Sequence, residues 1–330
     1  MKPTLTCALL ALALFAAAPA RAQRAATADF EQPGAYPIGS EAREWSDVNR
    51  GRRPIKVVIH YPKRLGATPL GQRPLIVFSH GLGGSANMYR YFGEHLASHG
   101  FFVIHPQHAG SDAEVAQRGQ IALRVAAAKL ENRIDRPLDV GFVLDQVSAL
   151  GASDRILRNV DLAQVAVAGH SFGAYTALAA VGQTVTVNGC VMSFRDPRLK
   201  AALAMSSQGA GTIGLTSESW RSIRIPVMTM TGSEDYGLGT DDVAERREAF
   251  EGMPAGLKFH LTIKDAEHHA FSDHQRLGLN PRDPRHHGWI LAAATAFFRA
   301  TLEGDQPALE WLQRKQLQRD TRREVRQEER

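Results

Sequence analysis

Short apolar runs and amphipathic segments alternate along the chain from about residue 55 to residue 301. The short runs are rich in branched apolar side chains, which is typical of buried strands. The amphipathic segments repeat their apolar positions every three or four residues, which predicts helices. Strands that alternate with helices at this spacing indicate an α/β fold, with a mostly parallel central sheet covered by helices on both faces. The expected strands are 55–61, 74–79, 101–104, 165–168, 201–205, 227–230 and 258–263, and the expected helices are 88–99, 138–150, 174–181 and 289–301.

Three segments fall outside this alternation. Residues 23–53 are rich in Ala, Pro, Gly and charge, which predicts a loose N-terminal extension. Residues 109–136 are polar, with a helical stretch at 117–130, and we expect them to cap one edge of the sheet. Residues 306–330 carry dense charge of mixed sign, which predicts a solvated helix or a disordered end. We therefore expect one folded domain at 54–305, without internal repeats.

The N-terminus has the features of an export signal. Lys2 supplies a positive charge, the run 9–18 is apolar, and Ala20-Arg21-Ala22 places small residues where a signal peptidase reads them. Residues 1–22 are therefore expected to be a cleaved signal peptide of a secreted or periplasmic protein. The apolar run is too short to span a bilayer comfortably, so we expect no stable membrane span. A lipoprotein is disfavoured because Cys7 precedes the apolar run.

The overall charge is less basic than it first looks. The chain has 39 Lys and Arg against 34 Asp and Glu, a formal net charge of +5. Almost all of this excess lies in the expected signal peptide and the C-terminal tail, which leaves a nearly neutral body and argues against nucleic-acid binding. Once Cys7 is removed with the signal, Cys190 is the single cysteine, and its apolar neighbours predict a buried structural thiol without a disulfide partner.

One five-residue motif carries the chemistry. Gly169-His170-Ser171-Phe172-Gly173 fits G-x-S-x-G, with the expected strand 165–168 before it and the expected helix 174–181 after it. The two glycines allow a tight turn that lifts the Ser171 hydroxyl above the sheet. In this context the motif indicates a nucleophilic serine at the turn between a strand and a helix.

A glycine-rich loop follows the second expected strand. The segment Ser79-His80-Gly81-Leu82-Gly83-Gly84 can supply a backbone N–H to the oxyanion that forms when a serine attacks an acyl group. We expect Leu82 to be this donor and Phe172, which follows the nucleophile, to be the second. No Lys-Ser/Thr pair follows the glycines, so a phosphate-binding loop is not supported.

A carboxylate and a histidine follow the last two expected strands. Asp235 lies just beyond the strand 227–230, and we prefer it as the orienting acid to its neighbours Glu234, Asp241 and Asp242. His268 and His269 lie beyond the strand 258–263, and either can be the base that accepts the serine proton. The order serine, acid, histidine is the one that α/β hydrolases use.

Further motifs are Asp47-x-x-Arg50-x-Arg52, Tyr61-Pro62 and Arg136-Pro137-Leu138-Asp139, in addition to the 79–84 loop, the 169–173 motif and Thr231-Gly232-x-x-Asp235. With these motifs the chain resembles the dienelactone-hydrolase-like branch of the α/β hydrolases that is similar to platelet-activating-factor acetylhydrolase. The resemblance runs from about Pro33 to Leu302 and implies the α/β-hydrolase fold, carboxylic-ester hydrolysis without a cofactor, and His268 as the base, since Ala266-x-His268-x-x-Phe271 fits the family pattern. Ser171 stands where true dienelactone hydrolases have cysteine, which argues against that activity.

Several alternatives remain at this level. The 13 histidines raise the possibility of a metal site, but no recognised ligand spacing is present, so we expect no metal. His105 and His108 follow a strand and are either pocket or plain loop residues. A peptidase or amidase would use the same triad, and a binding protein on this fold would be expected to lose a triad member. The expected substrate is a small-molecule ester of short, medium or compact acyl chain, because the chain has no long hydrophobic lid, and Ser206 to Gly214 is either part of its pocket or a flexible loop.

Overall fold

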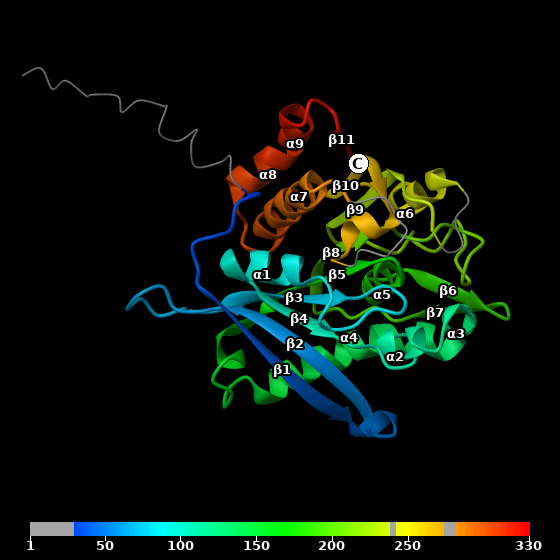
Figure 1. The fold of residues 1–330 in the computed structure, drawn as a ribbon, viewed down its shortest axis with the longest axis horizontal. Coiled ribbons are helices and arrows are strands. Elements are labelled where there is room, and N and C mark those ends of the chain that lie inside the picture. The colour runs from blue at the N-terminus through cyan, green and yellow to red at the C-terminus, as the bar shows by residue number, and fades with distance from the viewer. Residues whose placement is uncertain (1–29, 238–241, 274–281) are drawn as a thin grey trace, which may run out of the picture.

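A nine-stranded sheet forms the centre of the molecule (Figure 1), in a computed structural model that describes residues 30–237, 242–273 and 282–330. The strand order is β1-β2-β4-β3-β5-β8-β9-β10-β11. The strands from β4 to β10 in this order run parallel, whereas β1, β2 and β11 complete the two edges through antiparallel pairing. The bounds are β1 Ile38–Asp47, β2 Arg53–Pro62, β3 Arg73–Ser79, β4 Phe102–Pro106, β5 Val160–His170, β8 Leu199–Met205, β9 Val227–Glu234, β10 Lys258–Glu267 and β11 Val325–Glu329.

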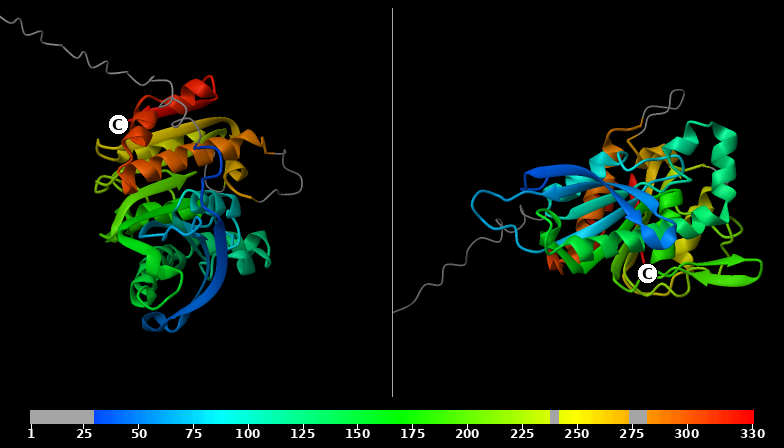
Figure 2. Two further views of the ribbon diagram at one scale, coloured as in Figure 1. Left: turned by 90° about the vertical axis from the view of Figure 1, so that its left-hand side faces the viewer. Right: turned by 90° about the horizontal axis from the view of Figure 1, so that it is seen from below.

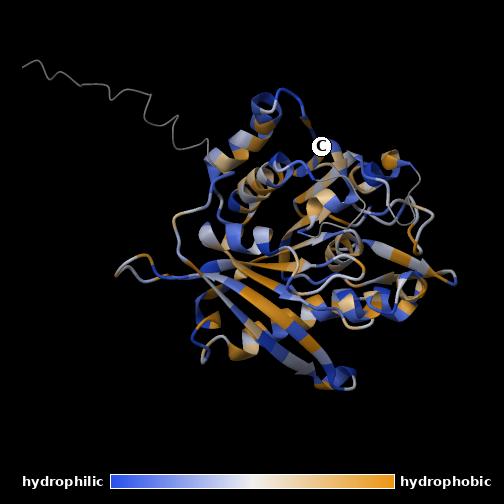
Figure 3. Ribbon diagram, in the orientation of Figure 1, coloured by the Kyte–Doolittle hydropathy of each residue, from blue (hydrophilic) through white to orange (hydrophobic). Residues whose placement is uncertain are grey.

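Helices cover the two faces of this sheet (Figure 2). Buried side chains of α4 (Leu130–Leu150) and α5 (Phe172–Ala180) pack into one apolar cluster, and those of α1 (Arg90–Ser98) and α7 (Arg285–Leu302) pack into a second. Hydrophobic residues line the central strands, while the helices show both hydrophilic and hydrophobic stretches (Figure 3). The sheet therefore separates two apolar layers, as expected for strands buried on both faces.

This architecture confirms the predicted α/β-hydrolase fold class. Each of the seven expected strands and four expected helices is present, with bounds that differ by a few residues at most ends. The largest difference is at α4, which begins at Leu130 and continues through Pro137. The segment 109–136 forms the short helices α2 (Ala113–Ala116) and α3 (Gln120–Ala128) and then enters α4. In the three described ranges, no helix combines the length and the apolar character needed to cross a membrane.

The N-terminal part of the chain differs from the prediction of a loose extension over 23–53. Residues 38–47 form β1, which pairs with β2 along its whole length, from Ile38 opposite Pro62 to Asp47 opposite Arg53. Only one face of this edge strand is buried, so polar residues alternate with buried ones such as Trp45. The sequence 38–47 therefore has few apolar positions, which concealed the strand.

The C-terminal segment 306–330 is part of the folded body and not a solvated tail. It forms α8 (Gln306–Gln313), α9 (Gln316–Asp320) and β11, and β11 pairs with β10. Its apolar side chains Trp311, Leu312, Leu317 and Val325 are buried. Two of its acidic side chains, Glu328 and Glu324, form ion pairs with Arg247 and Arg285. The prediction of a solvated or disordered end was wrong because the segment has many charges and few apolar side chains, and these few pack against the core.

The prediction of a buried Cys190 was also wrong. Cys190 is exposed and lies at the start of β7 (Cys190–Ser193), which pairs only with β6 (Thr184–Val187). Asn188 and Gly189 connect the two strands with positive φ angles of 49° and 79°, as a tight hairpin turn requires. Because this hairpin is a separate two-stranded sheet, the apolar neighbours of Cys190 do not imply burial.

Replacing the buried Leu312 tests whether the C-terminal segment stabilises the fold. Leu312 is fully buried in the apolar cluster that includes side chains of α7, so Leu312→Ala should lower the free energy of unfolding by about 2–5 kcal/mol in urea denaturation. Gln313→Ala, the exposed neighbour on the same helix, should change it by less than about 0.5 kcal/mol. Equal stability of the two variants would contradict the packing role of this segment.

Candidate active site

Ser171 lies in a strained turn between β5 and α5. Its backbone angles are φ 57° and ψ −121°, a region that residues with a side chain rarely adopt. The two glycines of the motif are required by space. A Cβ atom at Gly169 would lie 2.1 Å from the Gly173 carbonyl oxygen, and one at Gly173 would lie 1.9 Å from the Ser79 carbonyl oxygen. The turn can therefore close only because both positions lack a side chain.

The structure brings Ser171, His268 and Asp235 into one chain of hydrogen bonds. His268 Nε2 lies 2.9 Å from Ser171 Oγ, and His268 Nδ1 lies 2.7 Å from Asp235 Oδ1. Asp235 is fully buried just beyond β9, whereas His268 begins the 3₁₀ turn after β10 and Ser171 is partly exposed. Because the carboxylate accepts the Nδ1 proton, Nε2 carries the lone pair that can receive the serine proton.

Asp235 is held in its ionised form. Burial by itself raises the pKa of Asp235, but the hydrogen bond from His268 and the nearby positive charge of Arg246 outweigh burial and lower the pKa to about 2. Thr231 Oγ1 donates to the second carboxylate oxygen at 2.9 Å, and Arg246 Nε lies 3.6 Å from Oδ1. Strands β9 and β10 can meet here because Gly232 lacks a Cβ atom, which would lie 1.8 Å from the Ala266 carbonyl oxygen.

The other carboxylates and the second histidine lie elsewhere. Glu234 is exposed at the end of β9, and the Asp242 carboxylate caps a 3₁₀ turn by accepting a backbone N–H. Asp241 lies outside the described residues. His269 Nδ1 lies 3.3 Å from the carboxylate of the preceding Glu267. The geometry therefore places His268, and not His269, between the serine and the acid.

The glycine-rich loop lies against the nucleophile. A Cβ atom at Gly81 would lie 3.4 Å from the Ser171 Cβ, so the loop and the turn are in contact. Among the described residues, no acceptor faces the backbone N–H of Leu82 or of Phe172, whereas the neighbouring Gly83 N–H already donates to a carbonyl. Two unused N–H groups beside a nucleophile are the elements of an oxyanion hole.

His170 is a site residue that the sequence reasoning missed. Its ring lies 4.8 Å from the His268 ring, and its Nδ1 hydrogen-bonds to the Tyr89 hydroxyl at 2.8 Å. The same hydroxyl accepts the Gly81 N–H at 3.3 Å, so Tyr89 joins the loop to the nucleophile turn. Burial, together with the neighbouring His268, lowers the pKa of His170 well below its usual value and keeps its ring neutral. The available signal was its place in the motif, directly before Ser171.

A second Ser–His–Asp set lies beneath the loop and is closed to solvent. His108 Nε2 lies 2.9 Å from Ser79 Oγ, and His108 Nδ1 lies 2.9 Å from Asp139 Oδ2. All three side chains are fully buried, so Ser79 cannot reach a substrate. His105, left open by the sequence, is a buried strand residue packed against the ring of Phe78. In the described ranges, no group of three or more His, Cys, Asp or Glu residues could hold a metal ion.

The segment around Ser206 is hydrogen-bonded to neighbouring elements. The Arg246 side chain donates to the carbonyl oxygens of Ser206 and Ser207 at 3.3 and 3.0 Å, and the Ala210 N–H donates to Glu248 at 2.6 Å. Since Arg246 also contacts Asp235, this segment is tied to the acid of the site.

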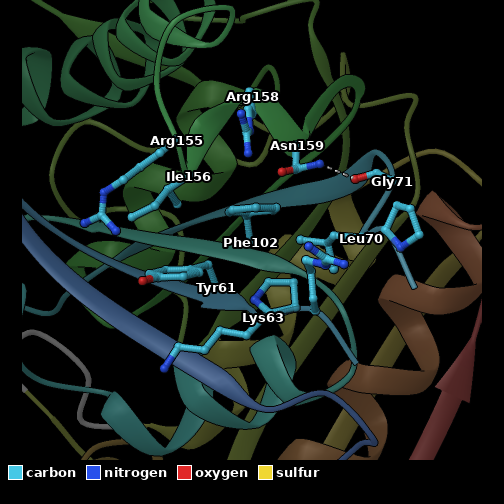
Figure 4. A pocket seen from close by; sticks show the side chains of 12 residues that line it. Tyr61, Lys63, Leu70, Gly71, Phe102, Arg155, Ile156, Arg158 and Asn159 are labelled. Atoms are coloured by element: carbon cyan, nitrogen blue, oxygen red, sulfur yellow. Dashed lines mark hydrogen bonds between the residues drawn. The ribbon is translucent and has the colours of Figure 1, made fainter. Parts of the chain in front are cut away.

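A pocket of about 810 Å³ lies near the starts of β4 and β5, at the end of these strands opposite to Ser171 (Figure 4). Aromatic and aliphatic side chains form its floor and basic side chains surround it, and neither Ser171 nor His268 is among them. The pocket is therefore separate from the catalytic geometry. Its labelled lining residues are Tyr61, Lys63, Leu70, Gly71, Phe102, Arg155, Ile156, Arg158 and Asn159.

The fold and the site together define an α/β hydrolase with a serine, histidine and aspartate triad. Comparisons with known proteins agree with this class. The family described as platelet-activating factor acetylhydrolase, isoform II, matches residues 61–134, which include the glycine-rich loop. The chain is also 25% identical over 229 residues to a platelet-activating factor acetylhydrolase of Cavia porcellus. This match covers 61% of the chain and 48% of the relative, so the chain spans about half of that protein. The predicted resemblance to this branch of serine ester hydrolases is confirmed.

The buried titratable groups around the site predict a loss of stability in acid. Burial lowers the pKa of His108 and His260 to about 4, and it lowers the pKa of His80 and His170 well below the usual value, so below pH ~6.5 only the unfolded chain binds their protons. The free energy of unfolding should therefore fall as the pH drops from 7 to 4, by about 1.4 kcal/mol per pH unit for each such proton. The stabilisation from Asp235, with its pKa of about 2, is lost only at still lower pH, below ~4.

Urea denaturation at pH 7, 6 and 5 measures this slope. His260 lies on β10 and bonds Thr229, so His260→Asn removes one of the titrating groups and should make the slope shallower by up to one proton. If the free energy of unfolding of the wild type does not change with pH, these histidines do not take up protons on unfolding, and the prediction is wrong.

Proposed function

We propose that this protein is a serine hydrolase that cleaves carboxylic esters through an acyl-enzyme on Ser171. The observation that carries the proposal is the hydrogen-bonded chain from Ser171 through His268 to the buried, ionised Asp235. A serine hydroxyl is a weak nucleophile until an oriented base removes its proton, and this chain supplies that base.

The geometry supports a two-step reaction. Ser171 Oγ attacks the carbonyl carbon while His268 Nε2 takes the hydroxyl proton, and the carbonyl oxygen becomes an anion that accepts the N–H groups of Leu82 and Phe172. Collapse of this intermediate breaks the bond to the alcohol oxygen, which receives the proton from His268. Water then attacks the acyl-enzyme with His268 again acting as base, and the acid leaves with Ser171 restored. No step requires a cofactor.

A compact or short-chain to medium-chain ester is the substrate class that we favour. The segment over the glycine-rich loop consists of the short helices α2 and α3, whose Ala116 and Leu123 pack on Gly83. A bridge between Gly84 and Asp112 anchors this segment. Such a small anchored cap supports compact esters over long triglycerides. The similar protein of Cavia porcellus is named as an acetylhydrolase, and acetyl is a compact acyl group.

Hydrolysis of 4-nitrophenyl acetate, butyrate and palmitate tests this function. The chain from Gln23 should hydrolyse the first two faster than the third, and Ser171→Ala should lower the rate by at least ~10³ because it removes the nucleophile. His268→Ala should cause a loss of similar size, whereas His269→Ala, the matched neighbour, should retain far more activity.

Equal activity of the wild type and Ser171→Ala would overturn the proposed nucleophile. Faster turnover of emulsified long-chain esters would overturn the substrate class. Cleavage of the butyryl 4-nitroanilide at a rate close to that of the ester would instead favour an amidase or peptidase.

We propose further that residues 1–22, which lie outside the described residues, direct export to the periplasm or the medium. The full chain, produced in a host with a periplasm, should yield a mature protein that mass spectrometry shows to begin at Gln23. Ala22→Arg should block cleavage because the peptidase needs a small residue there. A periplasmic or secreted protein that retains Met1 would sink this proposal.

A further inference from the structure

A buried arginine lies beside the catalytic turn without a carboxylate partner. Arg136 is fully buried, and among the described residues no carboxylate lies within ion-pair distance of its guanidinium. Burial lowers the pKa of Arg136 to about 9, with the more distant charge of Asp139 opposing that effect. Burying a charge in this way is costly, and an apolar residue of similar volume would stabilise the fold as well or better. Stability alone therefore does not account for the residue.

The contacts of Arg136 join the two segments that supply the oxyanion donors. On one side, its Nε donates to Thr176 Oγ1 at 2.8 Å, and its guanidinium carbon lies 4.5 Å from the centre of the Phe172 ring. On the other side, its Nη2 donates to Ser79 Oγ at 3.1 Å and to the His80 carbonyl oxygen. One rigid guanidinium thus contacts both the start of α5 and the glycine-rich loop.

The segment that covers the loop is held by the same side chain. Arg136 Nη1 donates to Ser111 Oγ at 2.9 Å, and the Ser111 carbonyl accepts the N–H of Gly83 at 2.9 Å. Leu82 lies between His80 and Gly83, which are therefore both tied to Arg136, directly or through Ser111. The direction of the Leu82 N–H depends on these two neighbours.

The buried Ser79–His108–Asp139 set continues this support. The Asp139 carboxylate accepts a hydrogen bond from Arg53 Nε at 2.9 Å and forms an ion pair with Arg50 at 2.8 Å. The His108 ring hydrogen-bonds to both Asp139 and Ser79, and the Ser79 hydroxyl oxygen also accepts the Arg136 N–H. Two motifs that marked the resemblance, around Arg50 and around Arg136, therefore meet in one network beneath the loop.

We propose that Arg136 is a positioning residue for the oxyanion hole. Its guanidinium holds the Leu82 and Phe172 N–H groups at their working separation, and its buried charge favours the anion that forms between them. This inference rests on the proposed esterase function. A displacement of about 1 Å between such donors can cost ~10²-fold in rate, so the cost of burying the charge is offset in the transition state.

The test compares Arg136→Met and Arg136→Lys with the wild type on 4-nitrophenyl butyrate. For Arg136→Met we expect kcat to fall by ~10²-fold with KM changed by less than about threefold, because the interaction acts on the transition state. Affinity for an alkylboronic acid, which forms a tetrahedral anion on the serine, should fall in parallel with kcat. Arg136→Lys keeps the charge but cannot span both segments, so it should recover only part of the loss.

Arg43→Met is the matched control. Arg43 is a partly buried arginine with several hydrogen bonds, and it donates to both carboxylate oxygens of Asp154 at 2.7 and 3.2 Å. Arg43 lies on β1. Asp154 precedes the start of β5, whereas Ser171 follows the end of that strand. Its loss should lower stability without changing kcat or boronate affinity.

Two milder variants decide the matter if Arg136→Met does not fold. Thr176→Val and Ser111→Ala each remove one acceptor of Arg136 and should lower kcat by about tenfold at nearly constant KM. If a folded Arg136→Met, or both milder variants, match Arg43→Met in kcat and boronate affinity, the inference is overturned while the esterase function stands. A wild type without ester hydrolysis or boronate binding would overturn both.

Discussion

The close contact between α5 and the end of β3 is the constraint on which the site depends. At Gly173 a Cβ atom would lie 1.9 Å from the Ser79 carbonyl oxygen, so the helix after the nucleophile reaches the glycine-rich loop only because the side chain is absent. The parallel pairing of β3 and β5, with Ser79 opposite Gly169, sets the two loops at the same edge of the sheet. Nucleophile and oxyanion donors therefore come together through the backbone, before any catalytic side chain makes a contact.

Burial controls the charges around this edge. Asp235 stays ionised because its hydrogen bonds and the charge of Arg246 outweigh the effect of burial. For His170 and His108, burial and the nearby His268 and Arg136 outweigh the opposing effect of Asp235 and Asp139, so the pKa of each ring is lowered and the rings stay neutral. The result is a negative charge behind His268, which stabilises the imidazolium that forms when the ring takes the serine proton.

The two Ser–His–Asp sets show that the triad pattern alone does not define a catalytic site. Both have hydrogen bonds of 2.7 to 2.9 Å, yet Ser79 is buried and Ser171 is partly exposed in a strained turn. In the buried set the hydroxyl is also occupied by Arg136. Access and backbone strain at the serine separate the nucleophile from the structural network.

The sequence by itself determined the order of strands and helices and the positions of Ser171, Asp235 and His268 on one edge of the sheet, because hydrophobic periodicity and turn glycines are local properties. Its own residues left His268 and His269 equivalent, and only the family resemblance separated them. The tertiary structure places His268 on the serine. It also decided the strand pairing of 38–47 and 306–330 and the exposure of Cys190, because these depend on which segments of the chain pair with each other. The sequence did not indicate the role of Arg136 either, because an arginine in a polar segment is expected to be solvated. Only the tertiary structure places Thr176, Ser79 and Phe172 around its guanidinium.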